Sequence, residues 1–523
     1  MDFVVMPRDQ KLPKEGINKV YLHIDYWNDF SFTTMFYLSL HDENGHFYDI
    51  GNVKIAFKGQ DISNTTYSKL GAGFSHLVDG YFSVGENLSY YKNLSKLPKA
   101  LKVKLMKSLL DIVYKPELIK SIQDEEVFKT SLLRDNSLTA IKGQFARVLD
   151  GKPELTNFNF SFVRPKSNNK DNINISFDVH ESSTPSTNIH ALIGRNGCGK
   201  TTILNGMIDA ITERDNLSGQ FLETVRWGND RPISKDYFSS LVSVSFSAFD
   251  PFEPPEEQPD PTKGTCYYYV GLKNRDKPNS LHAIPELRAG FVKSLIDCFR
   301  KANKKELWHS AIEKLGSDEN FASMNLSGLE ERYDTFKQYK DALQVDSKEF
   351  RRLFLEDIDL YLSRMSSGHA IVLFTITQLV STVEEKTLVL IDEPEGHLHP
   401  PLLSAFLRTL SELLYDQNGV AIIATHSPVV LQEIPKTCVW KINRIGETVQ
   451  PYRPEQETFG ENVGVLTREV FGLEVTSSGY HDLLSKSVKS GKTYEDIIRE
   501  YKNQLGLEAR VLLKTLITHR DNG

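Results

Sequence analysis

The stretch Gly194-Arg195-Asn196-Gly197-Cys198-Gly199-Lys200-Thr201 decides the fold of this 523-residue chain. It matches the phosphate-binding pattern G-x-x-x-x-G-K-[ST] at every fixed position. The apolar run Ile189-His190-Ala191-Leu192-Ile193 precedes it, and Thr202-Ile203-Leu204-Asn205 continues it as a predicted helix. A strand, a glycine-rich loop and a helix in this order gather backbone N–H groups and a helix N-terminus around an anion.

The residue types of this loop predict how a nucleotide is held. Lys200 is expected to neutralise charge on the β- and γ-phosphates, and the Thr201 hydroxyl is expected to bind Mg²⁺. Four further residues are expected to contact the phosphates: Asn196, Gly197, Gly199 and Thr202. ATP and Mg²⁺ are therefore the predicted ligands. A glycine-rich turn that matches by chance is the alternative, and the motifs downstream argue against it.

A second apolar run, Thr387-Leu388-Val389-Leu390-Ile391, ends in the carboxylates Asp392 and Glu393. Successive strand residues point to opposite faces, but the end of a strand relaxes this constraint, so both acids can face one ligand. Asp392 is expected to hold Mg²⁺, and Glu393 is expected to polarise the attacking water as a general base. The alternative, a solvated turn after a core strand, leaves two adjacent acids unexplained.

A third apolar run, Ala421-Ile422-Ile423-Ala424-Thr425, delivers His426 at its end. A lone histidine at a strand end is most often structural. Here a predicted helix with apolar residues at helical spacing, from Leu402 to Leu414, separates the run from the acidic strand. The resulting strand–helix–strand unit favours a role for His426 in sensing the γ-phosphate.

Taken together, these motifs resemble those of ABC-type ATPases of the SMC/RecF/OLD group. The residues that carry the resemblance are GRNGCGKTT at 194–202, RMSSGH at 364–369, LVLIDEPEGHLHP at 388–400 and ATHSP at 424–428. The resemblance implies an α/β P-loop ATPase head with an antiparallel β lobe. It also implies that Ser366 and Gly368, in the signature segment, contact the γ-phosphate bound to an opposite copy. Two copies would then form a head-to-tail dimer with two shared nucleotide sites, and a higher oligomer built from such pairs is the alternative.

The sequence departs from this family's pattern in two places. The signature differs from its ideal form at Met365, Ser367 and His369. The family's glutamine is missing from the end of the apolar run 241–250, where Ser247 or Asp250 could assist the metal or water instead; this absence puts the hydrolysis rate in doubt more than ATP binding. In the segment that crosses the family's dimer interface stand two histidines, His397 and His399, which either reach the opposite site or only pack there.

Changes in pattern along the chain predict its organisation. The β-rich part of the N-terminal region is expected to join the ATPase lobe, where Tyr48 could stack on adenine. The predicted regions are a β-rich then helical region at 1–150, the first half of the ATPase core at 151–250, a Pro-rich loop and helical insertion at 251–362, the second half of the core at 363–450 and a helical C-terminal tail at 451–523.

The layout outside the motifs resembles the ATPases of Septu-type antiphage systems (PtuA) and related retron effectors. This resemblance implies a defence ATPase that gates a separate HNH nuclease. The alternative is a RecF/SMC-like ATPase for DNA maintenance, which a basic surface would favour; the strongest local candidate is Arg300-Lys301 with Lys304-Lys305. A transporter's ATPase subunit is the third class. The long insertion before the signature argues against it.

Composition sets the outer limits of these hypotheses. Hydrophobic residues make up 40% and charged residues 25%, typical of a globular protein. The net charge of −7 argues against nonspecific nucleic-acid binding over the whole surface. We see no apolar run long enough for a membrane span and no signal peptide. The four dispersed cysteines indicate a reducing compartment, so the expected location is the cytoplasm.

Overall fold

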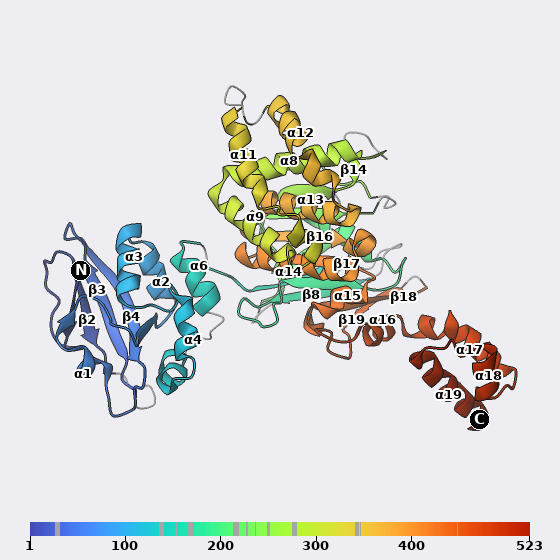
Figure 1. Cartoon of the computed structure of the whole chain (residues 1–523), viewed down its shortest axis with the longest axis horizontal. Helices are drawn as coiled ribbons and strands as arrows, with labels where there is room; N and C mark the ends of the chain where they lie inside the picture. The colour runs from blue at the N-terminus through green and yellow to red at the C-terminus, as the bar shows by residue number, and fades with distance from the viewer. Residues whose placement is uncertain are drawn as a thin grey trace. The chain divides into compact units, whose positions relative to one another are not determined.

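The computed structural model describes residues 1–26, 32–134, 141–152, 154–165, 172–212, 219–225, 229–235, 237–247, 252–274, 280–339, 345, 347–446, 448–477 and 479–522. The chain divides into two compact units, Met1–Leu155 and Thr156–Gly523 (Figure 1). Each unit has its own sheet and its own hydrophobic core.

Unit 1 is built on a six-stranded sheet of order β5-β1-β2-β3-β4-β6. Its strands are β1 (Asp2–Met6), β2 (Lys19–Ile24), β3 (Met35–His41), β4 (Phe47–Phe57), β5 (Gly73–Phe74) and β6 (Tyr81–Gly85). Only β1 and β2 pair in parallel; the other described pairs are antiparallel.

Helices of unit 1 pack on this sheet and complete its core. They are α1 (Thr66–Leu70), α2 (Leu88–Ser95), α3 (Lys99–Ser108), α4 (Ile119–Ile122) and α6 (Ala146–Leu149), with short η1 (Pro116–Leu118), η2 (Phe128–Leu132) and η3 (Ile141–Phe145) between them. α2 begins where Asn87 accepts hydrogen bonds from the N–H groups of Ser89 and Tyr90, a standard N-cap. Tyr90 and Tyr91 then enter the core.

The prediction that the N-terminal strands join the ATPase lobe is wrong. All six strands of unit 1 hydrogen-bond among themselves, and none pairs with a described strand of unit 2. Tyr48 on β4 lies near the Asp42 carboxylate, with its hydroxyl 3.4 Å from Oδ2. Tyr48 was expected at an adenine only because its strand was expected to join the ATPase lobe, and β4 belongs to the sheet of unit 1 instead.

Unit 2 is organised around a seven-stranded sheet of order β13-β12-β16-β17-β9-β18-β19. Its strands are β9 (Ile189–Ile193), β12 (Ser240–Ser245), β13 (Cys266–Gly271), β16 (Thr387–Asp392), β17 (Val420–Thr425), β18 (Val439–Ile445) and β19 (Thr448–Tyr452). Every neighbouring pair is parallel except β18 with β19. The central strands β9, β16 and β17 are mostly apolar and are buried at every residue because both faces of the sheet are covered.

One face of this sheet packs against helices, and the other packs against α7 (Lys200–Thr212) and a lobe. The lobe is an antiparallel sheet of order β11-β10-β7-β8, formed by β7 (Phe158–Arg164), β8 (Ile173–Val179), β10 (Gln220–Glu223) and β11 (Arg231–Pro232). Alternation along the strands divides the two cores: Val389 and Ile391 face the helices, whereas Leu388 and Leu390 face the lobe. The predicted P-loop α/β head with an antiparallel lobe is confirmed.

The helical layer lies on one side of the β16–β17 sheet in Figure 1, with β8 of the lobe on the other side. It contains α8 (Ile284–Arg300), α9 (Ala302–Leu315), α10 (Glu319–Ser323), α11 (Gly328–Tyr339), α12 (Lys348–Ser363), α13 (Ser367–Thr382) and α14 (Pro400–Asp416). The predicted insertion at 251–362 begins too early, because β13 belongs to the core sheet and pairs with β12 along its length. A short hairpin, β14 (Lys273–Asn274) with β15 (Ser280–Leu281), precedes the helices.

After the core sheet the described chain is mainly helical. The short helix α15 (Pro428–Gln432) still lies between β17 and β18, and the helices after β19 are α16 (Val463–Ser477), α17 (Tyr480–Lys489), α18 (Tyr494–Glu500) and α19 (Leu507–Asn522). The last three share a small core formed by Leu484, Val488, Ile497 and Leu513. No described helix combines the length and apolar character needed to cross a membrane. The four cysteines are buried and free.

Candidate nucleotide-binding site

The order of three neighbouring strands brings the predicted site residues to one edge of the sheet. β17 lies between β9 and β16, and all three run in parallel. Carboxyl ends of parallel strands therefore meet at the same edge, which is where ligands bind in open α/β sheets. The phosphate-binding loop follows β9, Asp392 ends β16, and His426 follows β17.

The loop after β9 has the backbone geometry that phosphate binding needs. Gly197 and Gly199 have φ angles of 77° and 101°, in the region that favours glycine. The Lys200 ammonium is buried and donates to the carbonyl oxygens of Gly194 and Arg195, at 2.9 and 3.0 Å. It is thus held at the mouth of the loop, beside the exposed backbone of Asn196 and Gly197. Thr202, two residues after Lys200 on α7, is also exposed.

The structure brings together the two predicted Mg²⁺ ligands, which stand 191 residues apart. The Thr201 hydroxyl lies 3.2 Å from Oδ1 and 3.0 Å from Oδ2 of Asp392. A hydroxyl and a carboxylate are oxygen donors of the kind Mg²⁺ prefers, commonly with waters and phosphate oxygens completing the octahedron. The pair therefore fits the ion that accompanies a nucleotide triphosphate.

Glu393 and His426 form a second pair beside the first. Glu393 has a φ of 49°, and its N–H donates to the carbonyl of Ala424 at 2.9 Å, so its backbone is held in the left-handed region beside the end of β17. The His426 Nδ1 lies 3.7 Å from Oε1 of Glu393. Interaction with the His426 ring lowers the pKa of the Glu393 carboxyl, although partial burial opposes this, and the same interaction raises the pKa of His426. Glu393 is consequently ionised, as a general base must be.

Glu395 was not among the predicted site residues. Its Oε1 accepts hydrogen bonds from the Thr425 hydroxyl at 2.6 Å and from the His426 N–H at 2.7 Å. It also lies 3.1 Å from the His426 Nδ1. Glu395 therefore ties the end of β17 to η5 (Pro394–His397), the segment after β16. The sequence offers one sign of this role: Glu395 stands two residues after the predicted base Glu393.

The signature residues lie at the start of α13, where Ser366 is the N-cap and is exposed to solvent. Its hydroxyl accepts from the His369 N–H at 3.4 Å and lies 2.6 Å from the His369 Nδ1. Gly368 is buried; a Cβ at this position would lie 2.8 Å from the carbonyl oxygen of His397. The signature helix is thus fitted closely onto the segment after the acidic strand.

The remaining residues predicted to assist the site lie on several different segments. His397 and His399 are exposed, and the His399 Nδ1 accepts from the Leu402 N–H as the N-cap of α14. Ser247 is half-buried just beyond the end of β12. Asp250 lies outside the described residues.

The basic run at 300–305 spans the end of α8 and the start of α9, and part of it is buried. Lys304 is buried, donates to the Val383 carbonyl and pairs with Glu384 at 3.1 Å. Lys305 pairs with Glu330 at 2.7 Å. Two of its four charges are therefore used within the helical layer.

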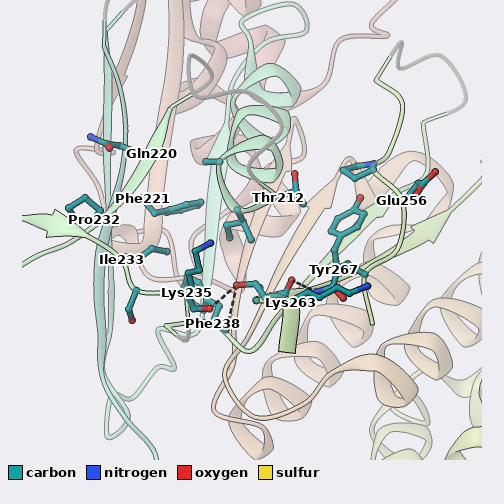
Figure 2. Close-up of a pocket in the computed structure, with 17 residues that line it drawn as sticks. Thr212, Gln220, Phe221, Pro232, Ile233, Lys235, Phe238, Glu256, Lys263 and Tyr267 are labelled. Carbon is teal, nitrogen blue, oxygen red and sulfur yellow. Dashed lines mark hydrogen bonds between the residues drawn. The ribbon is translucent and has the colours of Figure 1, made fainter. Parts of the chain in front are cut away.

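A pocket of about 630 Å³ lies between the far end of α7 and the lobe (Figure 2). Phe221, Phe238 and Tyr267 line it together with Lys235 and Lys263. Thr212, the last residue of α7, also lines the pocket. At about 1.5 Å per residue it lies about 18 Å along the helix from Lys200, at the P-loop end. This pocket is separate from the phosphate-binding loop.

Comparison with known proteins agrees with this geometry. Residues 278–432 match the protein-family model described as "AAA domain, putative AbiEii toxin, Type IV TA system". Over all 523 residues the chain is 56% identical to protein ea59 of Escherichia phage lambda, covering 100% of this chain and 99% of the relative. The chain belongs to the ea59 family. With its P-loop, acidic strand and AAA match, this member of the ea59 family carries an ATPase domain of the AAA/ABC type.

Solved structures similar to this ea59-family chain include two kinds of ATPase. The ATP-binding cassette MJ1267 of an ABC transporter, in its ADP conformation, has a TM-score of 0.30 and 14% identity, and the match covers 58% of this chain and 93% of that one. An Smc head bound to the C-terminal winged-helix domain of ScpA has a TM-score of 0.26 and 12% identity, covering 58% and 97%.

Proposed function

We propose that this protein is an ATP-operated switch in which two copies close head-to-tail around two ATP molecules. The observation that carries the proposal is the position of Ser366, exposed at the N-terminus of the 16-residue helix α13. An exposed helix N-terminus attracts a phosphate, and a serine hydroxyl at that position can donate to it. The chain's own phosphate loop follows β9, so each copy offers both halves of a shared site.

In this proposal the two carboxylates divide the chemistry of hydrolysis. Asp392 and Thr201 would hold Mg²⁺, which would neutralise charge on the phosphates. Glu393 accepts the proton of the attacking water, and His426 contacts the γ-phosphate from the neighbouring strand end. The 3.7 Å separation of Glu393 and His426 supports this division, because one water or phosphate oxygen can meet both groups.

The test is a Glu393→Gln variant, which keeps the shape of the side chain and removes the base. We expect hydrolysis to fall by about 10²- to 10⁴-fold and the ATP-bound dimer to accumulate in sedimentation velocity. Glu412→Gln, at a half-exposed glutamate that pairs with Lys314 on α9, serves as the matched control. A Glu393→Gln protein that stays monomeric with saturating ATP and Mg²⁺ would refute the shared-site dimer.

We further propose that the dimer gates a separate effector, a small HNH nuclease, in antiphage defence. Support comes from the layout resemblance to Septu-type ATPases, from the toxin and toxin–antitoxin system named in the matched family description, and from the phage origin of the ea59 relative. A clamp for DNA maintenance is the competing function. The burial of Lys304 weakens it, since that charge cannot meet a phosphate backbone.

Co-purification of the tagged chain, expressed with its native neighbouring genes, separates these two functions. Recovery of a small nuclease at fixed stoichiometry supports the gating role, and loss of nuclease control in the Glu393→Gln variant would connect it to ATP. Recovery of DNA-repair factors, or salt-sensitive DNA binding by the chain alone, would support the clamp instead.

A further inference from the structure

Three side chains from two helices, α13 and α10, form a hydrogen-bonded chain that ends at the signature serine. The Ser366 hydroxyl lies 2.6 Å from the His369 Nδ1, and the His369 Nε2 lies 3.2 Å from Oδ1 of Asp318. Asp318 is the N-cap of α10, 51 residues before His369. The side chains of Asp318 and His369 are only 6% and 7% exposed, and Phe321 packs its ring against the imidazole at 5.1 Å.

The direction of these hydrogen bonds follows from the charge of Asp318. Burial acts to raise the pKa of this carboxyl, but hydrogen bonds from the Phe321 N–H, His369 and the Asn320 N–H lower it overall. An ionised carboxylate only accepts hydrogen bonds, so the His369 Nε2 carries a proton and donates it. A neutral imidazole then has its lone pair on Nδ1, and the Ser366 hydroxyl donates to that atom.

This arrangement conflicts with the role proposed for Ser366. A γ-phosphate oxygen accepts hydrogen bonds, so Ser366 must turn its proton toward the phosphate in order to bind it. If His369 stays neutral, two lone pairs then face each other across the 2.6 Å contact. If Nδ1 instead gains a proton from solvent, it donates to the Ser366 oxygen and the hydroxyl proton is free for the phosphate.

We propose that His369 is a positioning residue that takes up a proton when Ser366 binds the γ-phosphate held by the opposite copy. This inference rests on the proposed ATP-driven dimer and adds that pH controls how tightly the dimer forms. The resulting imidazolium lies between the Asp318 carboxylate and the Ser366 oxygen, and both accept from it. Ser366 then contacts both the imidazolium and the incoming phosphate. The positive charge so close to the phosphate favours closure of the dimer.

Among the described residues, the titratable groups that face His369 are few. Asp318 comes from α10, and His399, the N-cap of α14, lies with its ring 6.1 Å away. Asp318, His369 and His399 are spaced closely enough for a metal ion. However, the His399 Nδ1 accepts the Leu402 N–H at 3.2 Å, which places its proton on Nε2 and removes the lone pair a metal would need. The hydrogen-bonded chain is therefore the better account.

The test measures the dimer dissociation constant with ATP and Mg²⁺ from about pH 6 to about pH 8, the range in which histidine titrates. Every protein carries Glu393→Gln so that ATP is not consumed. With one proton taken up at each of two sites, we expect association to weaken with rising pH by up to about 100-fold per pH unit. His369→Gln should weaken the dimer at pH 6 and remove most of this slope.

Asp318→Asn provides a second variant in case His369→Gln disturbs packing. Asparagine keeps the N-cap of α10 but removes the charge that stabilises the imidazolium, so the slope should move to lower pH. His309→Gln is the matched control, because His309 contacts Glu330 at 2.5 Å within α9 and α11 and has no part in the chain to Ser366. It should retain the full slope.

The outcomes separate the two proposals. Failure of the parent protein to dimerise with ATP overturns the proposed function itself. A normal ATP-driven dimer whose pH slope is unchanged by His369→Gln overturns only the proton uptake. Retention of one zinc or other divalent ion per chain, lost in both His369→Gln and Asp318→Asn, would also overturn it in favour of a metal site.

Discussion

Lys200 carries the most direct test of nucleotide binding. Its ammonium is held by the Gly194 and Arg195 carbonyls inside the loop, where a phosphate would meet it. We expect Lys200→Ala to abolish ATP binding, measured by titration with a fluorescent ATP analogue, with little loss of secondary structure. Lys314→Ala removes a half-exposed lysine on α9 and should bind normally. Unchanged binding by Lys200→Ala would remove the phosphate-loop assignment.

The Glu393–His426 pair predicts a defined pH dependence of stability. The pKa of Glu393 lies below its ordinary 4.5, so its contribution is present above about pH 4.5 and is lost as pH falls through the lowered value. The pKa of His426 lies above its ordinary 6.5, so its contribution is present below that pH and is lost as pH rises through the raised value. The pair therefore stabilises most between these two limits.

Comparison of wild type with His426→Gln by urea unfolding at several pH values measures this contribution. We expect the difference in unfolding free energy to be largest between about pH 4.5 and 6.5, to be small because both groups are partly exposed, and to shrink with added salt. A difference that keeps growing above pH 8 would assign the effect to packing of the ring instead.

At the scale of elements, the start of α13 depends on its fit against η5. A methyl group at Gly368 would come within 2.8 Å of the His397 carbonyl oxygen, whereas one at Gly396 would meet no atom within 4 Å. We expect Gly368→Ala to cost about 1–3 kcal/mol and to weaken the ATP-driven dimer while leaving ATP binding intact. Gly396→Ala is the matched control. Equal dimerisation of the two variants would show that the signature helix has room to shift.

The elements differ in how far the sequence could predict them. The phosphate loop, the acidic strand and the His426 strand were predictable because each motif is continuous and ends an apolar run. Because β16, β17 and β9 are adjacent and parallel, the residues at their carboxyl ends lie at the same edge of the sheet. Asp318 could not be found this way, since its contact with His369 is made by tertiary packing across 51 residues and no local pattern records it.

The same limit applies to the whole molecule. The sequence predicts a β-rich N-terminal region, and β1 to β4 form there, but a strand pattern does not specify a partner sheet. The strands were assigned to the ATPase lobe, and they form unit 1 instead. The lobe obtains its strands from β7, β8, β10 and β11, close in sequence to the phosphate loop. The pairs β7–β8 and β10–β11 are formed by neighbours in the chain, whereas β7 and β10 pair across β8, β9 and α7.

Because unit 1 has a separate sheet and core, we expect residues 1–155 to fold as an independent domain. Its buried set spans strands and helices alike, including Leu38 on β3 and Tyr91 on α2. The isolated unit should unfold in one cooperative transition in urea, with the same midpoint recorded by circular dichroism and tyrosine fluorescence.

Two variants in this unit test whether the described core holds it together. Leu38→Ala removes a fully buried side chain and should cost about 2–5 kcal/mol. Ile62→Ala alters a side chain that is 63% exposed and should change stability by less than about 0.5 kcal/mol. A fragment that binds hydrophobic dyes and unfolds without cooperativity would mean that unit 1 needs unit 2 for its fold. A cooperative fragment would instead leave its sheet free to serve as a module distinct from the ATPase.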